Sequence, residues 1–186
     1  MQDLIQRSVY REDHEQFRDA VRHFFDKEIV PHLAEWERNG IVPKEVWRKA
    51  GREGLLNTML PEPYGSGGDF GHAAVLIEEV GRTNATALGF PLHSDIVSPY
   101  IHAYGNKEQH DRWLPKMAAG ELIGAIAMTE PGAGSDLKSV RTTAKREGDH
   151  YIINGAKTFN TNGINSSIVI VVSNTAPDLG SKGGSR

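Results

Sequence analysis

The sequence predicts an α+β fold, with an N-terminal all-helical domain over residues 1–120 and the beginning of an antiparallel β-domain over residues 121–186. Two observations predict this fold. Apolar residues recur at helical spacing, with charged residues between them, through the first of these ranges. Short apolar runs separated by glycine-containing turn signals then replace that pattern.

An apolar stripe predicts the first helix. Its members are spaced by three or four residues or are adjacent: Phe17, Val21, Phe24, Phe25 and Ile29. Pro31 lacks a backbone donor, so we expect a kink or a short break near Val30 before the stripe resumes at Leu33 and Trp36. Gly40 is the expected end of this helical segment.

Further helices are expected up to the end of the first domain. "PKEVWRKAGREG" predicts a helix with Pro43 at its first position. Residues 72–84 and 92–104 predict two more. Asn106 is the expected N-cap of the last helix, which is predicted to stop at Gly120.

The remaining chain has the periodicity of strands. "LIGAIAM", residues 122–128, is a short apolar run of strand length. Turn signals at 147–149 and 154–155, flanked by residues that favour strands, predict a hairpin. "SSIVIVVSN", residues 166–174, predicts a buried strand, and the tail after it is expected to be a loop or a frayed end. So few strands would leave an open sheet edge, so we expect only part of a β-domain.

Composition excludes several classes of function. Hydrophobic content of 38% and charged content of 24% are typical of a globular protein. A net charge of −3 gives no basic patch for nucleic acid. The absence of cysteine excludes disulfides, thiolate zinc sites and a cysteine nucleophile.

The cellular location and the metal content are predicted from sequence patterns that the chain lacks. No apolar run is long enough to span a membrane, and the charged first 30 residues show no signal peptide, so we expect a cytoplasmic protein. The eight histidines form no His-x-x-x-His pattern, so we expect no metal site.

The segment "TEPGAGSD" is the first candidate ligand site. Gly132 and Gly134 permit positive φ and leave backbone amides unshielded, while Thr129 and Ser135 add hydroxyl groups. The loop could present these donors to a phosphate or to the edge of a polar ring. A plain turn between two strands explains the same residues equally well. The spacing excludes both a dinucleotide fingerprint and a P-loop.

The segment "KTFNTNG", residues 157–163, is the second candidate. If it is a strand, Phe159 and Thr161 point to the same face. An aromatic ring beside a hydroxyl suits a flat heteroaromatic ligand. Taken alone, an ordinary half-buried strand is the simpler interpretation.

Together, the two segments resemble the acyl-CoA dehydrogenase family of flavoproteins. "AMTEPGAGSD" followed by "YIINGAKTFNTNG" is the family pattern, and "PEPYGSGGDF" and the helical sequence around it are similar as well. The resemblance covers nearly the whole chain and looks closest to the long-chain type. It implies FAD as cofactor and α,β-dehydrogenation of acyl-CoA thioesters in fatty-acid β-oxidation, with electrons passing to an electron-transfer flavoprotein.

The resemblance implies site residues position by position. The implied cofactor contacts are Ile126, Ala127, Met128, Thr129, Gly134, Ser135, Phe159, Asn160 and Thr161. Thr129 would bond to the pyrimidine edge of the flavin, and Ser135 would bond to a phosphate of FAD and lie beside the pantetheine of the substrate. Phe159 would pack on the flavin ring and Thr161 would bond near N5. Asn160 departs from the family's usual apolar or small residue.

The resemblance also implies a chain about twice as long. The catalytic glutamate of the family lies in a C-terminal helical bundle, and no residue here corresponds to it, so we expect no catalytic residue and no turnover in this chain. We expect the full-length protein to be a homo-oligomer. The alternatives are a related flavoenzyme, either an acyl-CoA oxidase or a flavin monooxygenase, and a truncated binding protein without catalysis.

Overall fold

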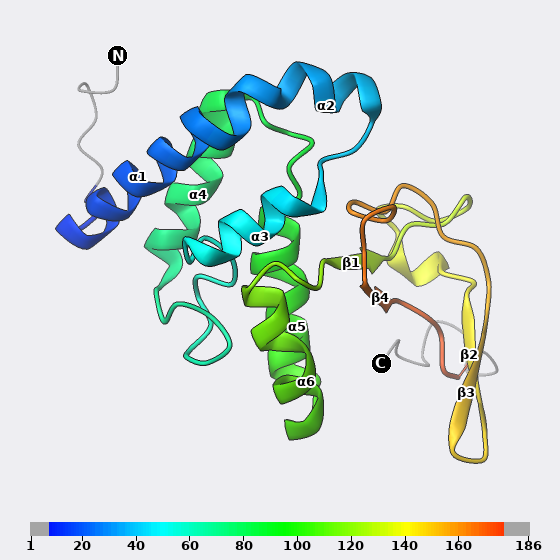
Figure 1. Cartoon of the computed structure of the whole chain (residues 1–186). Helices are drawn as coiled ribbons and strands as arrows, with labels where there is room; N and C mark the ends of the chain where they lie inside the picture. Colours follow the sequence, from blue (N-terminus) through cyan, green and yellow to red (C-terminus); the bar gives the residue numbers. More distant parts are fainter. Residues whose placement is uncertain (1–7, 177–186) are drawn as a thin grey trace. The chain divides into compact units, whose positions relative to one another are not determined.

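The computed structural model describes residues 8–176 (Figure 1). The chain divides into two compact units, of which the first extends to Ile123 and the second begins at Gly124. The tail after residue 176, expected to be a loop, lies outside the described residues. Within the described range, no helix is long and apolar enough to cross a membrane.

From residue 8 onward, helices are the only regular secondary structure of the first unit. Its α-helices are α1 (Glu12–Phe24), α2 (Leu33–Asn39), α3 (Lys44–Arg52), α4 (Phe70–Thr83), α5 (Ser98–Tyr104) and α6 (Lys107–Ala118). π-helical turns at Phe25–Ile29 and Leu92–Val97 lead into α2 and α5, the first of them through a 3₁₀ turn at Val30–His32. The helical interpretation of this part of the sequence is therefore confirmed.

Local signals place several of the helix ends. The predicted break near Val30 is confirmed, because the α-helical pattern changes to π and then to 3₁₀ around Pro31. Gly40 ends α2 in the left-handed region, with a φ of 68°. Asn106 caps α6, where its side chain accepts a hydrogen bond from the Gln109 amide. The prediction for Pro43 is wrong by one position, because Pro43 is the N-cap of α3 and not its first residue.

The core of this unit forms where α1, α3 and α4 bury their apolar stripes. Trp47 of α3 packs edge-to-face on Phe90, with ring centroids 4.6 Å apart. Other fully buried side chains are Val21, Phe25, Ile29, Leu55, Leu56 and Leu76. α1 and α4 lie side by side (Figure 1).

An ion network accompanies the contact between α1 and α4. The Glu79 side chain is 2% exposed and accepts hydrogen bonds from Arg22, at 2.8 Å, and from Arg82. Arg22 comes from α1, whereas Glu79 and Arg82 come from α4. The buried carboxylate is therefore paired across the helix contact, which offsets the cost of its desolvation.

The described part of the second unit, up to residue 176, contains four short strands in two pairs. They are β1 (Gly124–Ala127), β2 (Thr143–Glu147), β3 (His150–Asn154) and β4 (Ile168–Val171). β2 and β3 form the predicted antiparallel hairpin, and its turn includes Gly148 with a φ of 66°. β1 and β4 pair in parallel, from Gly124 opposite Ile168 to Ala127 opposite Val171, so the antiparallel expectation is wrong for this pair. The long connection between them includes the hairpin and returns the chain to the same end of the pair.

Two further strand predictions need correction. Residues 157–163 are not a strand, because Phe159 and Asn162 adopt left-handed φ values of 55° and 65° and the segment turns. Phe159 and Thr161 therefore do not share a strand face. β4 is not buried, because its residues alternate between half-buried and exposed. Such alternation is typical of a strand with one covered face.

Candidate cofactor-binding site

The first candidate segment starts where β1 ends. Ile126 and Ala127 are buried in the strand, and Met128 and Thr129 follow it as half-buried residues. The amide of Glu130 donates to the Ala133 carbonyl at 2.8 Å, and the reverse bond is 3.1 Å. These two bonds close a tight turn at the start of the loop.

The glycines of this loop leave open space. Neither Gly132 nor Gly134 adopts a positive φ, so the backbone conformation does not explain their presence. A Cβ at either position would meet nothing within 4 Å. Gly134 and Ser135 are exposed, and their amides donate to no acceptor in the part of the chain that the structure describes. The loop therefore presents free donors at its surface.

The second candidate segment lies directly against the first. The Thr158 amide donates to the Thr129 carbonyl at 2.9 Å. The Lys157 ammonium donates to the Met128 carbonyl at 3.0 Å and to Oε1 of Glu130 at 2.8 Å. Residues that lie almost 30 positions apart in the sequence are thus joined by three hydrogen bonds.

Phe159 is the most unusual residue of the second segment. Its side chain is 92% exposed and its φ is 55°. Left-handed backbone is uncommon for a bulky residue and is often found at functional sites. Asn160 is half-buried beside it and Thr161 is exposed. The ring and the Thr161 hydroxyl are thus accessible on the same turn.

Glu130 has no features of a general base. Its carboxylate is buried and accepts hydrogen bonds from the Lys157 ammonium and from the Arg141 and Thr142 amides. The Lys157 ammonium is the main reason that the pKa of this carboxyl falls to about 2. A carboxylate held so firmly in its anionic form takes up protons poorly near neutral pH. Lys157, which the sequence analysis did not single out, is recognisable only from this long-range contact.

Gly155 allows the chain that follows β3 to approach Thr142, the residue just before β2. A Cβ at this position would lie 2.7 Å from Cα of Thr142, a backbone atom that cannot move by itself. We expect Gly155→Ala to destabilise the second unit by about 1–3 kcal/mol, as overpacking does. Urea unfolding followed by NMR signals of β2 and β3 measures this. Gly132→Ala is the control, since its Cβ meets open space, and an equal loss in both variants would contradict the steric argument.

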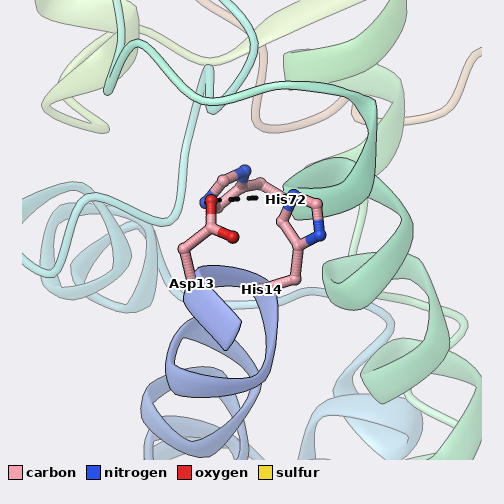
Figure 2. A group of neighbouring side chains, drawn as sticks. All are labelled: Asp13, His14 and His72. Carbon is pink, nitrogen blue, oxygen red and sulfur yellow. Dashed lines mark ion pairs between the residues drawn. The ribbon is translucent and has the colours of Figure 1, made fainter. Parts of the chain in front are cut away.

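A second cluster, in the first unit, was not predicted. Asp13, His14 and His72 point toward one another, with one potential ligand atom from each within 4.8 Å of the others (Figure 2). His14 and His72 come from α1 and α4, far apart in the sequence, so no spacing rule could find them. Such a group raises the question of a metal ion.

The hydrogen bonds of the cluster favour helix capping over metal binding. Nδ1 of His14 accepts from the Arg11 amide at 3.1 Å, so the neutral ring carries its proton on Nε2, 2.8 Å from Oδ1 of Asp69. Neither ring nitrogen of His14 then has a free lone pair for an ion. The Arg11 guanidinium also contacts the carboxylates of Asp13 and Asp69, each at 2.9 Å, and would repel a cation. The cluster therefore joins the N-terminal ends of α1 and α4.

Comparison with known proteins identifies the family. Residues 11–121 match the family model "Acyl-CoA dehydrogenase, N-terminal domain", and residues 125–185 match "Acyl-CoA dehydrogenase, middle domain". The chain is 53% identical over 174 residues to the mitochondrial long-chain specific acyl-CoA dehydrogenase of Mus musculus. That match covers 93% of this chain and 40% of the relative.

Solved structures agree with this result. An acyl-CoA dehydrogenase from Geobacillus kaustophilus superposes with a TM-score of 0.89 at 48% identity, over 92% of this chain and 46% of that one. An acyl-CoA dehydrogenase from Bacillus anthracis, solved with FAD, gives 0.78 at 31% identity over 92% and 30%.

The fold and the paired loop segments are those of a class of proteins that includes an acyl-CoA dehydrogenase solved with FAD. The chain belongs to the acyl-CoA dehydrogenase family, as the sequence motifs predicted, and its similarity to the long-chain type is confirmed. It spans about 40% of the length of the curated long-chain relatives that it matches.

Proposed function

We propose that this chain supplies the N-terminal helical domain and the first FAD-contacting segments of an acyl-CoA dehydrogenase. The protein as a whole would catalyse α,β-dehydrogenation of long-chain acyl-CoA thioesters in fatty-acid β-oxidation. One observation carries the proposal: residues 128–130 and 157–158 are bonded side by side, next to the exposed Phe159 ring. An exposed aromatic ring beside free hydroxyl and amide donors is typical of a site for a flat, phosphate-bearing ligand.

The residues fit FAD by their chemistry. The hydroxyls of Thr129, Ser135 and Thr161 bond to no other group in the described part of the chain and are at least partly exposed. In this proposal Thr129 bonds to the pyrimidine edge of the flavin, Ser135 to a phosphate and to pantetheine, Phe159 packs on the ring and Thr161 bonds near N5. Bound FAD would supply the hydride acceptor. The remaining contacts are assigned to Ile126, Ala127, Met128, Gly134 and Asn160.

The proposal assigns no catalytic residue to this chain. Glu130, the acidic residue of the candidate site, is committed to hydrogen bonds and cannot serve as the base. We place the helical domain at 1–120 and the partial β-domain at 121–186, and we assign the base to a C-terminal helical bundle outside this chain. Acyl-CoA as substrate, an electron-transfer flavoprotein as electron acceptor and a homo-oligomer at full length belong to the same proposal.

The cytoplasmic location expected from the sequence stays a prediction. The Mus musculus relative is named as mitochondrial, whereas a relative 39% identical comes from Bacillus subtilis. Location therefore differs among relatives and does not follow from family membership.

A chimera tests the proposed function. Residues 1–186 would replace the corresponding part of the Geobacillus kaustophilus acyl-CoA dehydrogenase, with the unmodified relative as the positive control. We expect the purified chimera to contain FAD and to lose its visible flavin absorbance when a long-chain acyl-CoA is added without oxygen. A folded, FAD-containing chimera that no acyl-CoA reduces would contradict the proposal. Rapid reoxidation of the reduced flavin by oxygen would favour an oxidase or a monooxygenase.

The isolated chain should retain FAD weakly or not at all. Half of a cofactor site provides only part of the favourable contacts, but FAD loses the same conformational and rotational freedom when it binds. We expect gel filtration with excess FAD to yield a colourless protein without dehydrogenase turnover. Stoichiometric yellow flavin on the 186-residue chain would contradict this.

A further inference from the structure

The Glu130 carboxylate is buried and accepts hydrogen bonds from three groups, the Lys157 ammonium and the Arg141 and Thr142 amides. Its side chain is 6% exposed, and that of its partner Lys157 is 10% exposed. The second lysine–glutamate pair in the described part of this unit, Lys145–Glu147, lies in solvent, with side chains that are 79% and 47% exposed. Exposed pairs of that kind contribute little, whereas a buried pair is costly to break.

One end of this network closes the glycine loop. Oε2 of Glu130 accepts from the Arg141 amide at 2.8 Å, and Oε1 accepts from the Thr142 amide at 2.9 Å. The chain therefore leaves Glu130, passes through Ser135 and returns to the same carboxylate. The carboxylate closes the base of the loop, although Ser135 itself is exposed.

The other end of the network fastens the second segment. The Lys157 ammonium bonds to Glu130 and to the carbonyl of Met128, at 2.8 and 3.0 Å. The next residue, Thr158, donates its amide to Thr129 at 2.9 Å. Phe159 follows directly, so the position of its ring relative to Thr129 depends on these three bonds.

We infer that Glu130 and Lys157 are positioning residues that hold the two proposed FAD-contacting segments together, an inference that rests on the proposed function. Neither residue touches the cofactor in this account. They act through Thr129, Ser135 and Phe159, whose backbone they fix.

The charge state of the pair supports this role. The pKa of Glu130 lies at about 2, below its ordinary value of 4.5, so the carboxylate stays ionised throughout the physiological range. Its contribution to stability is present above pH 4.5 and is lost as the pH falls toward 2. The two segments should therefore stay fastened at any neutral or mildly acidic pH.

Amide exchange in the 186-residue chain tests the coupling without cofactor. Glu130→Gln should speed exchange of the Thr158 amide, and Lys157→Met should speed exchange of the Arg141 and Thr142 amides, each roughly tenfold or more. Each variant thus acts on amides that its own side chain does not contact. Lys145→Met and Glu147→Gln are the matched controls and should leave all three amides unchanged. If each variant affected only its own neighbours, the inference would be overturned.

FAD affinity of the chimera tests positioning as opposed to stability. Glu130→Gln should weaken FAD binding roughly tenfold, the loss expected for a charged hydrogen bond. Lys157→Arg, which keeps the cation, should bind FAD better than Lys157→Met. Glu79→Ala, which disturbs only the helical unit, should leave the affinity unchanged. Equal loss of affinity in Glu79→Ala and Glu130→Gln would show that Glu130 and Lys157 contribute only to general stability. A chimera that binds no FAD would contradict the proposed function, and the amide exchange result would then decide whether the two segments are coupled.

Discussion

Glu79→Ala is expected to lower the free energy of unfolding of the helical unit by about 3 kcal/mol. The Glu79 side chain is 2% exposed and pairs with Arg22 and Arg82 between α1 and α4. Removing the carboxylate leaves two guanidinium groups without their buried partner. This value lies at the low end of the range for a broken buried ion pair. The side chains of Arg22 and Arg82 are each about a third exposed, so water can hydrate their guanidinium groups.

Tryptophan fluorescence during urea unfolding measures this loss. All three tryptophans, Trp36, Trp47 and Trp113, lie in the helical unit, so the signal reports that unit alone. Glu45→Ala is the matched control, since Glu45 pairs with Arg48 and Arg52 at the surface of α3. We expect the control to change stability by less than about 1 kcal/mol. Equal losses in the two variants would show that the buried network has no special role.

Asp95→Asn is expected to make the helical unit more sensitive to acid. Burial lowers the pKa of His93 to about 4, and burial raises the pKa of Asp95 to about 6. Below pH 6.5 the unfolded chain protonates His93 while the folded chain does not, so stability falls until about pH 4. Asp95 acts in the opposite direction: the folded chain takes up its proton first, so stability rises as the pH falls from about 6 to 3.8.

The two effects partly cancel in the unmodified chain. At about 1.4 kcal/mol for each pH unit between folded and unfolded pKa values, His93 costs about 3 kcal/mol by pH 4. Asp95 returns about 2 kcal/mol, after allowance for its partial exposure. Asp95→Asn removes the stabilisation that comes from Asp95 and keeps the loss that comes from His93. The free energy of unfolding of this variant should therefore fall steeply between pH 6.5 and 4.

Urea unfolding at a series of pH values measures the difference. Trp47 is a suitable reporter because its ring lies 5.3 Å from that of His93. His93→Gln is the complementary variant, and its stability should rise over the same interval as Asp95 takes up its proton. Parallel pH curves for the unmodified chain and Asp95→Asn would contradict the linkage.

The parts of the fold that local chemistry determines could be predicted from the sequence. Asn106 caps its own helix and Gly40 ends one, because each acts on residues within one turn. The parallel pairing of β1 with β4 could not be predicted, because it depends on the path of the whole connection between them. Phe159 was wrongly predicted to lie in a strand, since its left-handed backbone has no sequence signal in a non-glycine residue.

The candidate site divides in the same way. Thr129, Ser135 and Thr161 are predicted site residues that come from motifs, because the family resemblance assigns them. Lys157 was not, because its role exists only through contact with Met128 and Glu130 across the fold. The cluster of Asp13, His14 and His72 was missed for the same reason (Figure 2).

The FAD content of the chimera is the most direct test of the proposal that residues 126–129, 134–135 and 159–161 together contact the cofactor. We expect equimolar FAD in the unmodified chimera and a clear loss of affinity in Phe159→Ala. Ile164→Ala is the matched control, since Ile164 is an exposed apolar residue too, at 83%, but lies outside both segments. A chimera that folds like its parent but purifies without flavin, or one in which Phe159→Ala and Ile164→Ala bind FAD equally well, would contradict the account.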